Sequence, residues 1–349
     1  MKLGLICILG SGETLASSGK THEYVARRLP ENPKITILET PAGFEPNSAD
    51  VANKIKTFLE RRLQNYSPRI EVLPARKKSD PFSTNDPEIV SPILEADEIL
   101  LGPGSPTYGA KHLRDSLAAD MIKARHRLGA TLFLSSSSTL AFSKYTMPVY
   151  EIYKVGDKLH WQRGVNFFQP FGWSISIIPH WDNNDGGDTV DTSRCYMGRD
   201  RFGRLRDLLP DGQTIIGLDE HTSVVFDFDK ECCYVLGNKG VVILRDDKEH
   251  RFESGDSFPL SIFGEWQMPD NSDISAELWQ QATETAERLE RESAEANVAP
   301  DEVVALADER GAARADKNWA RSDELRDEIA SLGWQVKDTK DGYELEPSS

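Results

Sequence analysis

A run of four serines, Ser135 to Ser138, is the feature of the sequence with the clearest chemical potential. It follows the apolar segment 129–134, which predicts a buried strand, and it opens a segment of small residues. A turn from a strand into a helix can expose a serine hydroxyl as a nucleophile, and small neighbours allow the strained backbone that this requires. The glycines usual in such a turn are missing here. Because serines also cap helix N-termini, a helix cap is the alternative interpretation.

Candidate bases and acids for such a serine lie further along the chain. His180 follows the apolar run 175–179, and Asp219, Glu220 and His221 follow the apolar run 215–218. A histidine and a carboxylate at strand ends can complete a relay, in which the histidine takes the serine proton and the carboxylate orients the histidine. From the residues alone, both histidines remain candidate bases.

Two glycine-containing loops also follow apolar runs. Residues 10–13 read Gly-Ser-Gly-Glu, and residues 102–106 read Gly-Pro-Gly-Ser-Pro. Glycines let the backbone turn sharply and direct N–H groups at a phosphate or at an oxyanion. Neither loop has the spacing of a dinucleotide-binding or P-loop motif, so we expect no nucleotide cofactor. A plain connection between a strand and a helix is the alternative for each loop.

Short apolar runs alternate with amphipathic segments through the first half of the chain. Continuous apolar runs predict strands buried on both faces, as in parallel sheets covered by helices. The predicted strands are 3–9, 35–38, 70–73, 99–101 and 131–134, and the predicted helices are 49–65, 87–96 and 107–127. We therefore predict an α/β fold with a doubly wound, mostly parallel sheet, and ligands should bind beyond the carboxyl ends of its strands.

The pattern changes after about residue 210. Closely spaced apolar runs leave no room for helices and predict an antiparallel extension, at 214–218, 224–228, 232–236 and 241–244. The tail is rich in Ala, Glu and Arg and predicts helices at 278–294, 301–313 and 316–332, a strand at 334–336 and a turn at Asp341-Gly342. The expected domains are a core at 1–266, a linker helix in 267–299 and a small helical module at 300–349.

Composition argues against several kinds of partner. The net charge of −16 repels phosphate backbones and anionic lipid, so binding to DNA or to a membrane surface is not expected. No apolar stretch is long enough for a membrane span. The four cysteines include no C-x-x-C pair and predict reduced thiols in a cytoplasmic protein. The acidic segment 182–191 lacks calcium-loop spacing, so we expect no metal there, but a solvated loop or one that recognises a basic substrate.

The order of these features resembles that of peptidase E and cyanophycinase-like proteins over about residues 1–245. The most specific matching pieces are Arg199 to Leu205 and Ile216 to Thr222, each taken with His180 upstream. The resemblance implies a class I glutamine-amidotransferase-like fold and a serine nucleophile. By position, it implies Ser136 as the nucleophile, His180 as the base and Glu220 as the orienting acid, with His221 as an alternative base.

The same resemblance implies an oxyanion or substrate loop. Its residues are Gly102, Gly104 and Ser105, with a second N–H from Ser137. Two features depart from the family. The serine turn has lost the glycines and alanines of the family's G-T-S-A-G-A sequence, which falls on Leu134 to Thr139, and the acidic insert separates His180 from Arg199. An inactive descendant is therefore an alternative to an enzyme.

The tail resembles the C-terminal segment of cysteinyl-tRNA synthetases. The matching residues include Ala307 to Arg310, Lys317 to Asp323 and Lys337 to Thr339. The resemblance makes tRNA a candidate partner. Synthetase activity is not expected, because the chain has neither an H-I-G-H nor a K-M-S-K-S sequence. Residues 300–349 have a net charge of −6, so tRNA binding through them alone should be weak, and a packing or interaction module is the alternative.

Three hypotheses for function result. The first is a serine hydrolase that cleaves a peptide or isopeptide-like amide in a peptide-like or small-molecule substrate, without a cofactor. The second is a catalytically inactive binding module of amidotransferase-like shape. The third is a translation-linked protein that contacts tRNA through its C-terminal module. None of the three specifies an oligomeric state.

Overall fold

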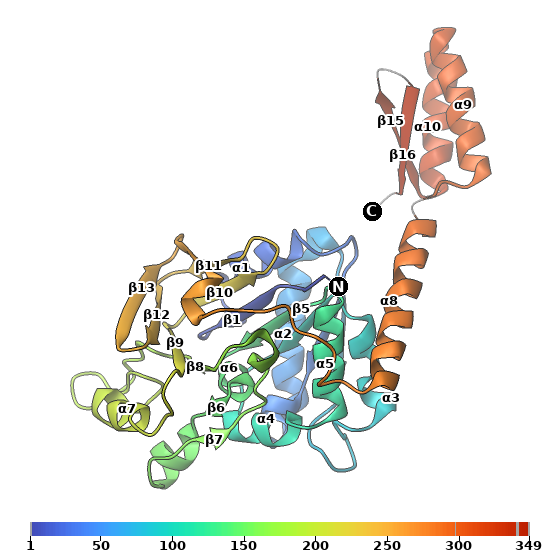
Figure 1. Ribbon diagram of the computed structural model, residues 1–349. Coiled ribbons are helices and arrows are strands. Elements are labelled where there is room, and N and C mark those ends of the chain that lie inside the picture. The colour runs from blue at the N-terminus through green and yellow to red at the C-terminus, as the bar shows by residue number, and fades with distance from the viewer. Residues whose placement is uncertain (1, 297, 340–341, 348–349) are drawn as a thin grey trace. The chain divides into compact units, whose positions relative to one another are not determined.

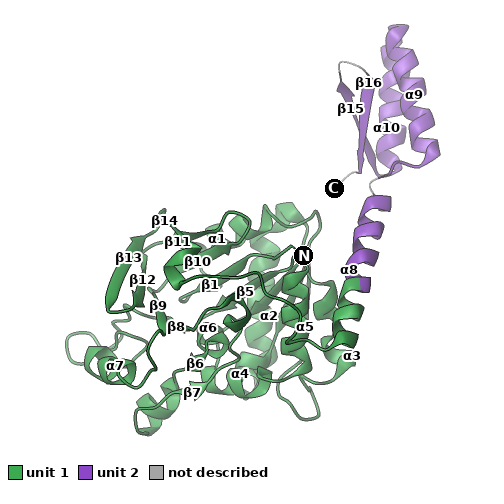
Figure 2. Cartoon of the chain, viewed as in Figure 1, with its two compact units in different colours: residues 1–283 green, residues 284–349 purple. Residues whose placement is uncertain are grey.

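The apolar runs of the N-terminal half pair in parallel within one large sheet (Figure 1). The computed structural model describes residues 2–296, 298–339 and 342–347, and Figure 2 divides the chain into two units, 1–283 and 284–349. The large sheet belongs to the first unit. In order across the sheet its strands are β14 (Ser257–Pro259), β11 (Cys232–Gly237), β10 (Thr222–Asp227), β1 (Ile6–Leu9), β5 (Thr131–Ser135), β4 (Glu98–Leu101), β2 (Lys34–Leu38) and β3 (Arg69–Leu73).

Alternate residues of the central strands face opposite sides of this sheet. In β1, Cys7 and Leu9 pack with apolar residues of helices α1 (Ala16–Ala26) and α2 (Ser48–Arg62). Ile6 and Ile8 belong to the other core, which includes helix α5 (Leu117–Arg127). Both faces are therefore covered, as the continuous apolar runs predicted, and the predicted fold class is confirmed.

The remaining helices of the first unit are short. They are α3 (Pro87–Val90), α4 (Pro106–Leu113), α6 (Ser137–Phe142) and α7 (Gly198–Arg206). The segment 107–127 thus forms two helices where the sequence predicted one. Asp115 adopts a positive φ of 55°, and the Ser116 hydroxyl accepts a hydrogen bond from Ala119 N at 3.2 Å, which caps α5. Similarly, 87–96 is only α3 followed by a 3₁₀ turn over Ser91–Glu95.

The predicted antiparallel extension is divided between two sheets. Strands β10, β11 and β14 extend the large sheet in antiparallel fashion from β1. A second sheet has the order β13 (Lys248–Glu253), β12 (Gly240–Arg245), β9 (Thr214–Leu218) and β8 (Ile175–Ile178). Strands β8 and β9 are parallel neighbours, so their carboxyl ends lie at the same edge. A two-stranded pair, β6 (Tyr145–Thr146) and β7 (Gln162–Arg163), completes the strands of this unit.

The second unit contains a helical pair and a β-hairpin. Its elements are α9 (Asp301–Ala315), α10 (Trp319–Ser331), β15 (Trp334–Thr339) and β16 (Gly342–Pro347), while α8 (Ala276–Ala296) contains the boundary between the units. Val303, Ala307, Ile329 and Trp334 form its small core. The turn predicted at Asp341-Gly342 lies partly outside the described residues, since Asp341 is not among them. In the described part of the chain, no helix combines the length and apolar character that crossing a bilayer requires.

Candidate active site

Ser136 occupies a strained turn between β5 and α6. Its backbone has φ 51° and ψ −116°, a combination that an L-residue adopts only when its surroundings enforce it. Its N–H donates to Leu9 O at 2.9 Å, which ties the turn to the end of β1. The turn therefore has the strand-to-helix geometry of a nucleophile elbow although it contains no glycine.

The hydroxyls of the serine run have different partners. The Ser136 side chain makes no capping bond to α6, and its Oγ lies 3.0 Å from His180 Nε2. Ser135 Oγ donates to Glu13 Oε2 at 3.0 Å, and Ser138 Oγ donates to Gly102 O. Ser138 falls where the G-T-S-A-G-A sequence of the resembling family has its second glycine. The serine adds a hydroxyl at this position, and the hydrogen bond to Gly102 O satisfies it. The helix-cap interpretation does not describe the Ser136 side chain.

His180 follows β8 and also has a positive φ, 51°. Its Nδ1 lies 3.0 Å from Glu220 Oε1, so one imidazole joins Ser136 to a carboxylate. Trp181 anchors this position. Its N–H donates to Leu218 O at 2.9 Å, and its indole lies over Gly217, where a Cβ atom would come within 2.4 Å of the ring. The sequence motif 216–222 therefore includes a glycine on which the neighbouring tryptophan packs.

Glu220 follows β9 at the edge that β8 shares with it, which explains why residues 40 positions apart meet. The hydrogen bond with His180, supplemented by one from Asn183, lowers the pKa of Glu220 from 4.5 to about 2, although partial burial acts in the opposite direction. The carboxylate is therefore ionised at neutral pH. It can orient the imidazole and stabilise the imidazolium that forms when His180 accepts a proton.

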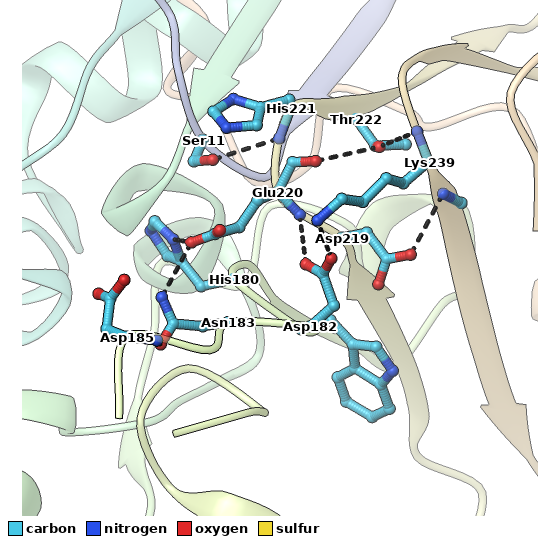
Figure 3. Close-up of polar contacts among 12 residues, drawn as sticks. Ser11, His180, Asp182, Asn183, Asp185, Asp219, Glu220, His221, Thr222 and Lys239 are labelled. Carbon is cyan, nitrogen blue, oxygen red and sulfur yellow. Dashed lines mark hydrogen bonds and ion pairs between the residues drawn. The ribbon is translucent and has the colours of Figure 1, made fainter. Parts of the chain in front are cut away.

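Figure 3 shows two further residues that hold Glu220, and both come from the acidic insert. Asn183 Nδ2 donates to Glu220 Oε1 at 3.0 Å, and Asp182 Oδ1 accepts from Glu220 N at 2.8 Å. Asp182 also forms an ion pair with Lys239. The sequence reasoning missed these contacts, because it treated the insert as a solvated or substrate-recognising loop. The one available signal was that the insert directly follows His180-Trp181.

Two neighbours of Glu220 in the sequence have other roles. Asp219 Oδ2 accepts from Arg251 Nη2 at 2.6 Å and from Gly240 N at 3.2 Å, which fixes the second sheet. His221 donates its backbone N–H to Ser11 Oγ at 3.2 Å, and its buried Nδ1 has no hydrogen-bond partner among the residues that the structure describes. Among the described residues, no hydrogen bond joins the His221 ring to Ser136. The geometry thus brings His180, and not His221, to the serine.

The glycine loop after β4 lies against the serine turn through the hydrogen bond from Ser138 to Gly102 O. Gly104 has a φ of 152°, and a Cβ atom there would lie 1.9 Å from Pro41 O, so only glycine fits. Ser105 caps α4 by accepting from Tyr108 N at 3.3 Å. Ser137 is the first residue of α6, and within the described ranges its buried Oγ has no hydrogen-bond partner.

A cavity of about 490 Å³ adjoins this loop. Ser105 and Thr107 line it together with Tyr150 and Glu151, and the Tyr150 hydroxyl donates to Gly104 O at 3.3 Å. Further lining residues are Phe44, Tyr108, Lys111, Arg114, Gln162 and Arg163. The cavity offers cationic, aromatic and acidic groups beside the predicted oxyanion loop.

Within the described ranges, no group of three or more His, Cys, Asp or Glu side chains is arranged to hold a metal ion.

Comparison with solved structures identifies the fold of the large unit. A peptidase from an acI-B1 actinobacterium is similar with a TM-score of 0.59 and 20% sequence identity, over 74% of this chain and 97% of that chain. A putative peptidase E protein from Listeria monocytogenes EGD-e is more distant, with a TM-score of 0.43 and 12% identity over 72% of this chain and 98% of that chain. The first similarity shows that this chain shares the α/β fold of that peptidase.

The tail matches a different family. Residues 296–344 match the cysteinyl-tRNA ligase anticodon binding domain. The cysteine–tRNA ligase of Opitutus terrae is 55% identical over 49 residues, which are 14% of this chain and 11% of that protein. The enzyme of Methylocella silvestris is 48% identical over 61 residues, 17% of this chain and 14% of that protein. The chain thus spans about a tenth of the length of the first of these relatives, and the predicted resemblance of the tail is confirmed.

Proposed function

We propose that the first unit is a serine hydrolase that cleaves a peptide or isopeptide-like amide. The observation that carries this proposal is the continuous chain of hydrogen bonds from Ser136 Oγ through the His180 ring to Glu220, with 3.0 Å at each step. The Ser136 to His180 distance is within hydrogen-bond reach, which a general base requires. It therefore favours catalysis over the inactive binding module. The peptidase-type fold of the unit supports the same class of reaction.

In the proposed reaction, Ser136 Oγ attacks the amide carbonyl carbon while His180 Nε2 takes the hydroxyl proton. Glu220 stabilises the imidazolium through Nδ1. Backbone N–H groups of Ser137 and of the Gly102 to Gly104 loop stabilise the tetrahedral oxyanion. Collapse of this intermediate breaks the C–N bond, and His180 returns the proton to the leaving amine. Water, deprotonated by the same histidine, then releases the acyl group and regenerates Ser136.

The cavity beside Ser105 supplies the proposed binding site for the substrate's polar groups, since cationic and acidic side chains line it together. A peptide or isopeptide carries groups of both signs.

We also propose a cytoplasmic location, because all four cysteines are free thiols and three of them are buried.

This function is tested by incubating the protein with a library of dipeptides and side-chain-linked isopeptides and measuring the amine that hydrolysis releases. We expect the wild-type protein to cleave at least one class of amide and the Ser136→Ala variant to cleave it at least about 1,000-fold more slowly. Retention of the activity in Ser136→Ala would assign it to another nucleophile. His180→Ala and His221→Ala provide a matched pair, in which only the first should lose activity.

We propose a second function for the tail, namely contact with the anticodon region of tRNA. The match of residues 296–344 to an anticodon binding domain favours it. The net charge of this segment is negative, so the contact should involve few phosphate groups and should weaken only slightly with rising salt. Fluorescence anisotropy with the full-length protein and labelled tRNA at low salt tests this idea. No increase in anisotropy at about 50 mM salt, with a cysteine–tRNA ligase as positive control, would exclude it.

A further inference from the structure

Asn183 makes a contact that the three-residue relay does not require. Its side chain is 3% exposed, and its Nδ2 donates to Glu220 Oε1 at 3.0 Å. The same oxygen accepts from His180 Nδ1, also at 3.0 Å. One carboxylate oxygen is thus held by two donors, and Figure 3 shows Asn183 and His180 approaching it together. The position of that oxygen depends on both.

The carbonyl oxygen of the Asn183 side chain fixes the orientation of the amide group. Asn183 Oδ1 accepts from Asp185 N at 3.2 Å, so the carbonyl side of the amide faces a donor and the NH₂ side faces the carboxylate. The reverse orientation would place two oxygens together and two N–H groups together. The Asn183 backbone N–H also donates to His180 O at 3.2 Å, which holds the asparagine against the turn that carries the histidine.

The preceding residue holds the backbone of the same acid. Asp182 Oδ1 accepts from Glu220 N at 2.8 Å, while Asp182 Oδ2 pairs with Lys239. Two successive residues of the insert therefore fix both the main chain and the side chain of Glu220. A solvated or substrate-recognising loop would not need these contacts.

We propose that Asn183 is a positioning residue of the hydrolase, which keeps the Glu220 carboxylate in the orientation that His180 needs. The inference rests on the proposed hydrolase function and extends it to a fourth side chain. Without the asparagine donor, the carboxylate can rotate about its last bond, and the His180 Nδ1 hydrogen bond is no longer aligned in every molecule. The acidic insert is then part of the catalytic framework.

Substitutions at 183 and at its neighbour separate this role from a general effect on folding. Asn183→Ala removes the donor. Asn183→Asp keeps the shape but replaces the donor with a second carboxylate beside Glu220. Asn184→Ala is the matched control, because Asn184 is the same residue type at the next position and its side chain is exposed. Thermal unfolding of each variant checks that it is folded.

The readout is the rate constant for fluorophosphonate labelling of Ser136 as a function of pH. We expect Asn183→Ala to label about 10- to 100-fold more slowly near neutral pH, because a hydrogen bond to a charged group is lost. As the pH is lowered, its labelling rate should begin to fall at a higher pH than that of wild type, because the Glu220 oxygen that bonds His180 Nδ1 has lost its second donor. Other titratable groups that face Glu220 are His180, Asp182, Cys195, Tyr196, His221 and Lys239.

Asn183→Asp should label more slowly than Asn183→Ala near neutral pH, because two carboxylates then repel each other beside the imidazole. The deficit relative to Asn183→Ala should shrink as the pH falls and the pair takes up a proton, which restores a donor. Asn184→Ala should follow the wild-type profile. A loss of stability alone would not produce these opposite pH trends.

A second measurement does not depend on labelling. The low-field proton resonance of the His180 Nδ1–H, identified by its absence in Glu220→Gln, should shift or broaden in Asn183→Ala and stay unchanged in Asn184→Ala. Wild-type rates, an unchanged pH profile and an unchanged resonance in Asn183→Ala would overturn the positioning role. Failure of the wild-type protein to label at Ser136 would instead overturn the hydrolase function, and the resonance would still decide whether Asn183 holds the carboxylate.

Discussion

Glu98 offers a test of how the large sheet is built, because its carboxyl group is buried and no described residue hydrogen-bonds to it. The residue begins β4, is 1% exposed and lies between Ile35 of β2 and Thr131 of β5. Neither carboxyl oxygen has a hydrogen-bond partner in the part of the chain that the structure describes. Burial raises the pKa of Glu98 from 4.5 to about 8, so the folded protein holds this group protonated at neutral pH.

The direction in which the free energy of unfolding changes with pH follows from proton binding by Glu98 in the folded and unfolded states. Below pH 4.5 the group is protonated in both the folded and the unfolded states and adds no pH dependence. Between 4.5 and about 8 only the unfolded state ionises, so the free energy of unfolding decreases by up to about 1.4 kcal/mol per pH unit. Above that range the loss is complete. Glu98→Gln removes the titration and keeps the shape.

We therefore expect Glu98→Gln to gain stability relative to wild type as the pH rises, by up to about 4 kcal/mol between about pH 4.5 and 7.5. Urea unfolding at several pH values, followed by tryptophan fluorescence, measures this difference. Glu71→Gln, at an exposed position on the edge strand β3 of the same sheet, should not change with pH in this way. A stability difference between Glu98→Gln and wild type that stays constant from pH 5 to 8 would refute the reasoning.

Three other substitutions probe the site and the tail. The pKa of Glu220 is lowered from 4.5 to about 2, so the stability that this ionised group adds is present above pH 4.5 and lost as the pH falls toward 2. Acid unfolding of Glu220→Gln should therefore be less steep than that of wild type. Gly104→Ala should slow Ser136 labelling at least about 10-fold, because the added Cβ would lie 1.9 Å from Pro41 O and must displace the loop. Arg310→Ala should destabilise the second unit by about 1.5 to 3 kcal/mol in thermal unfolding, because Arg310 is 1% exposed and donates to the Asp338 carboxylate at 2.7 and 3.1 Å.

Two of these substitutions have a matched comparison within the chain. Gly203→Ala adds a Cβ that meets no atom within 4 Å, so it should leave labelling unchanged. Arg326→Ala removes a guanidinium that is half exposed and 4.0 Å from the same aspartate, and it should cost less than about 1 kcal/mol. Equal effects of Gly104→Ala and Gly203→Ala, or of Arg310→Ala and Arg326→Ala, would contradict these assignments. So would identical acid unfolding of Glu220→Gln and wild type.

The strands were the most predictable part of the fold, because burial on both faces leaves continuous apolar runs in the sequence. The division of 107–127 into two helices was not predictable from apolar spacing, since it depends on the positive φ of Asp115 and on the Ser116 cap. The division of the strands after residue 210 between two sheets could not be predicted from the sequence either. It depends on which edges pair, and the four predicted runs 214–218, 224–228, 232–236 and 241–244 are all apolar.

The candidate site shows the same limit at the level of single residues. Strand-end positions marked the serine run, two histidines and an acidic pair as candidates, and the family resemblance narrowed them to Ser136, His180 and Glu220. The structure brings these three side chains into contact. The loss of the turn glycines looked unfavourable in the sequence, because a hydrogen bond from Ser138 to a carbonyl 36 residues away cannot be read from spacing. Asn183 was missed for a related reason, since its partner lies 37 residues further along the chain.

Mass-spectrometric mapping of the fluorophosphonate adduct tests the central claim most directly, because it identifies the nucleophile without knowledge of the substrate. We predict one modified residue, Ser136, in the wild-type protein, and no adduct in Ser136→Ala or after unfolding. An adduct on Ser135, Ser137 or a serine outside the turn, or no adduct on folded wild-type protein, would contradict the assignment of Ser136, His180 and Glu220 as a catalytic relay.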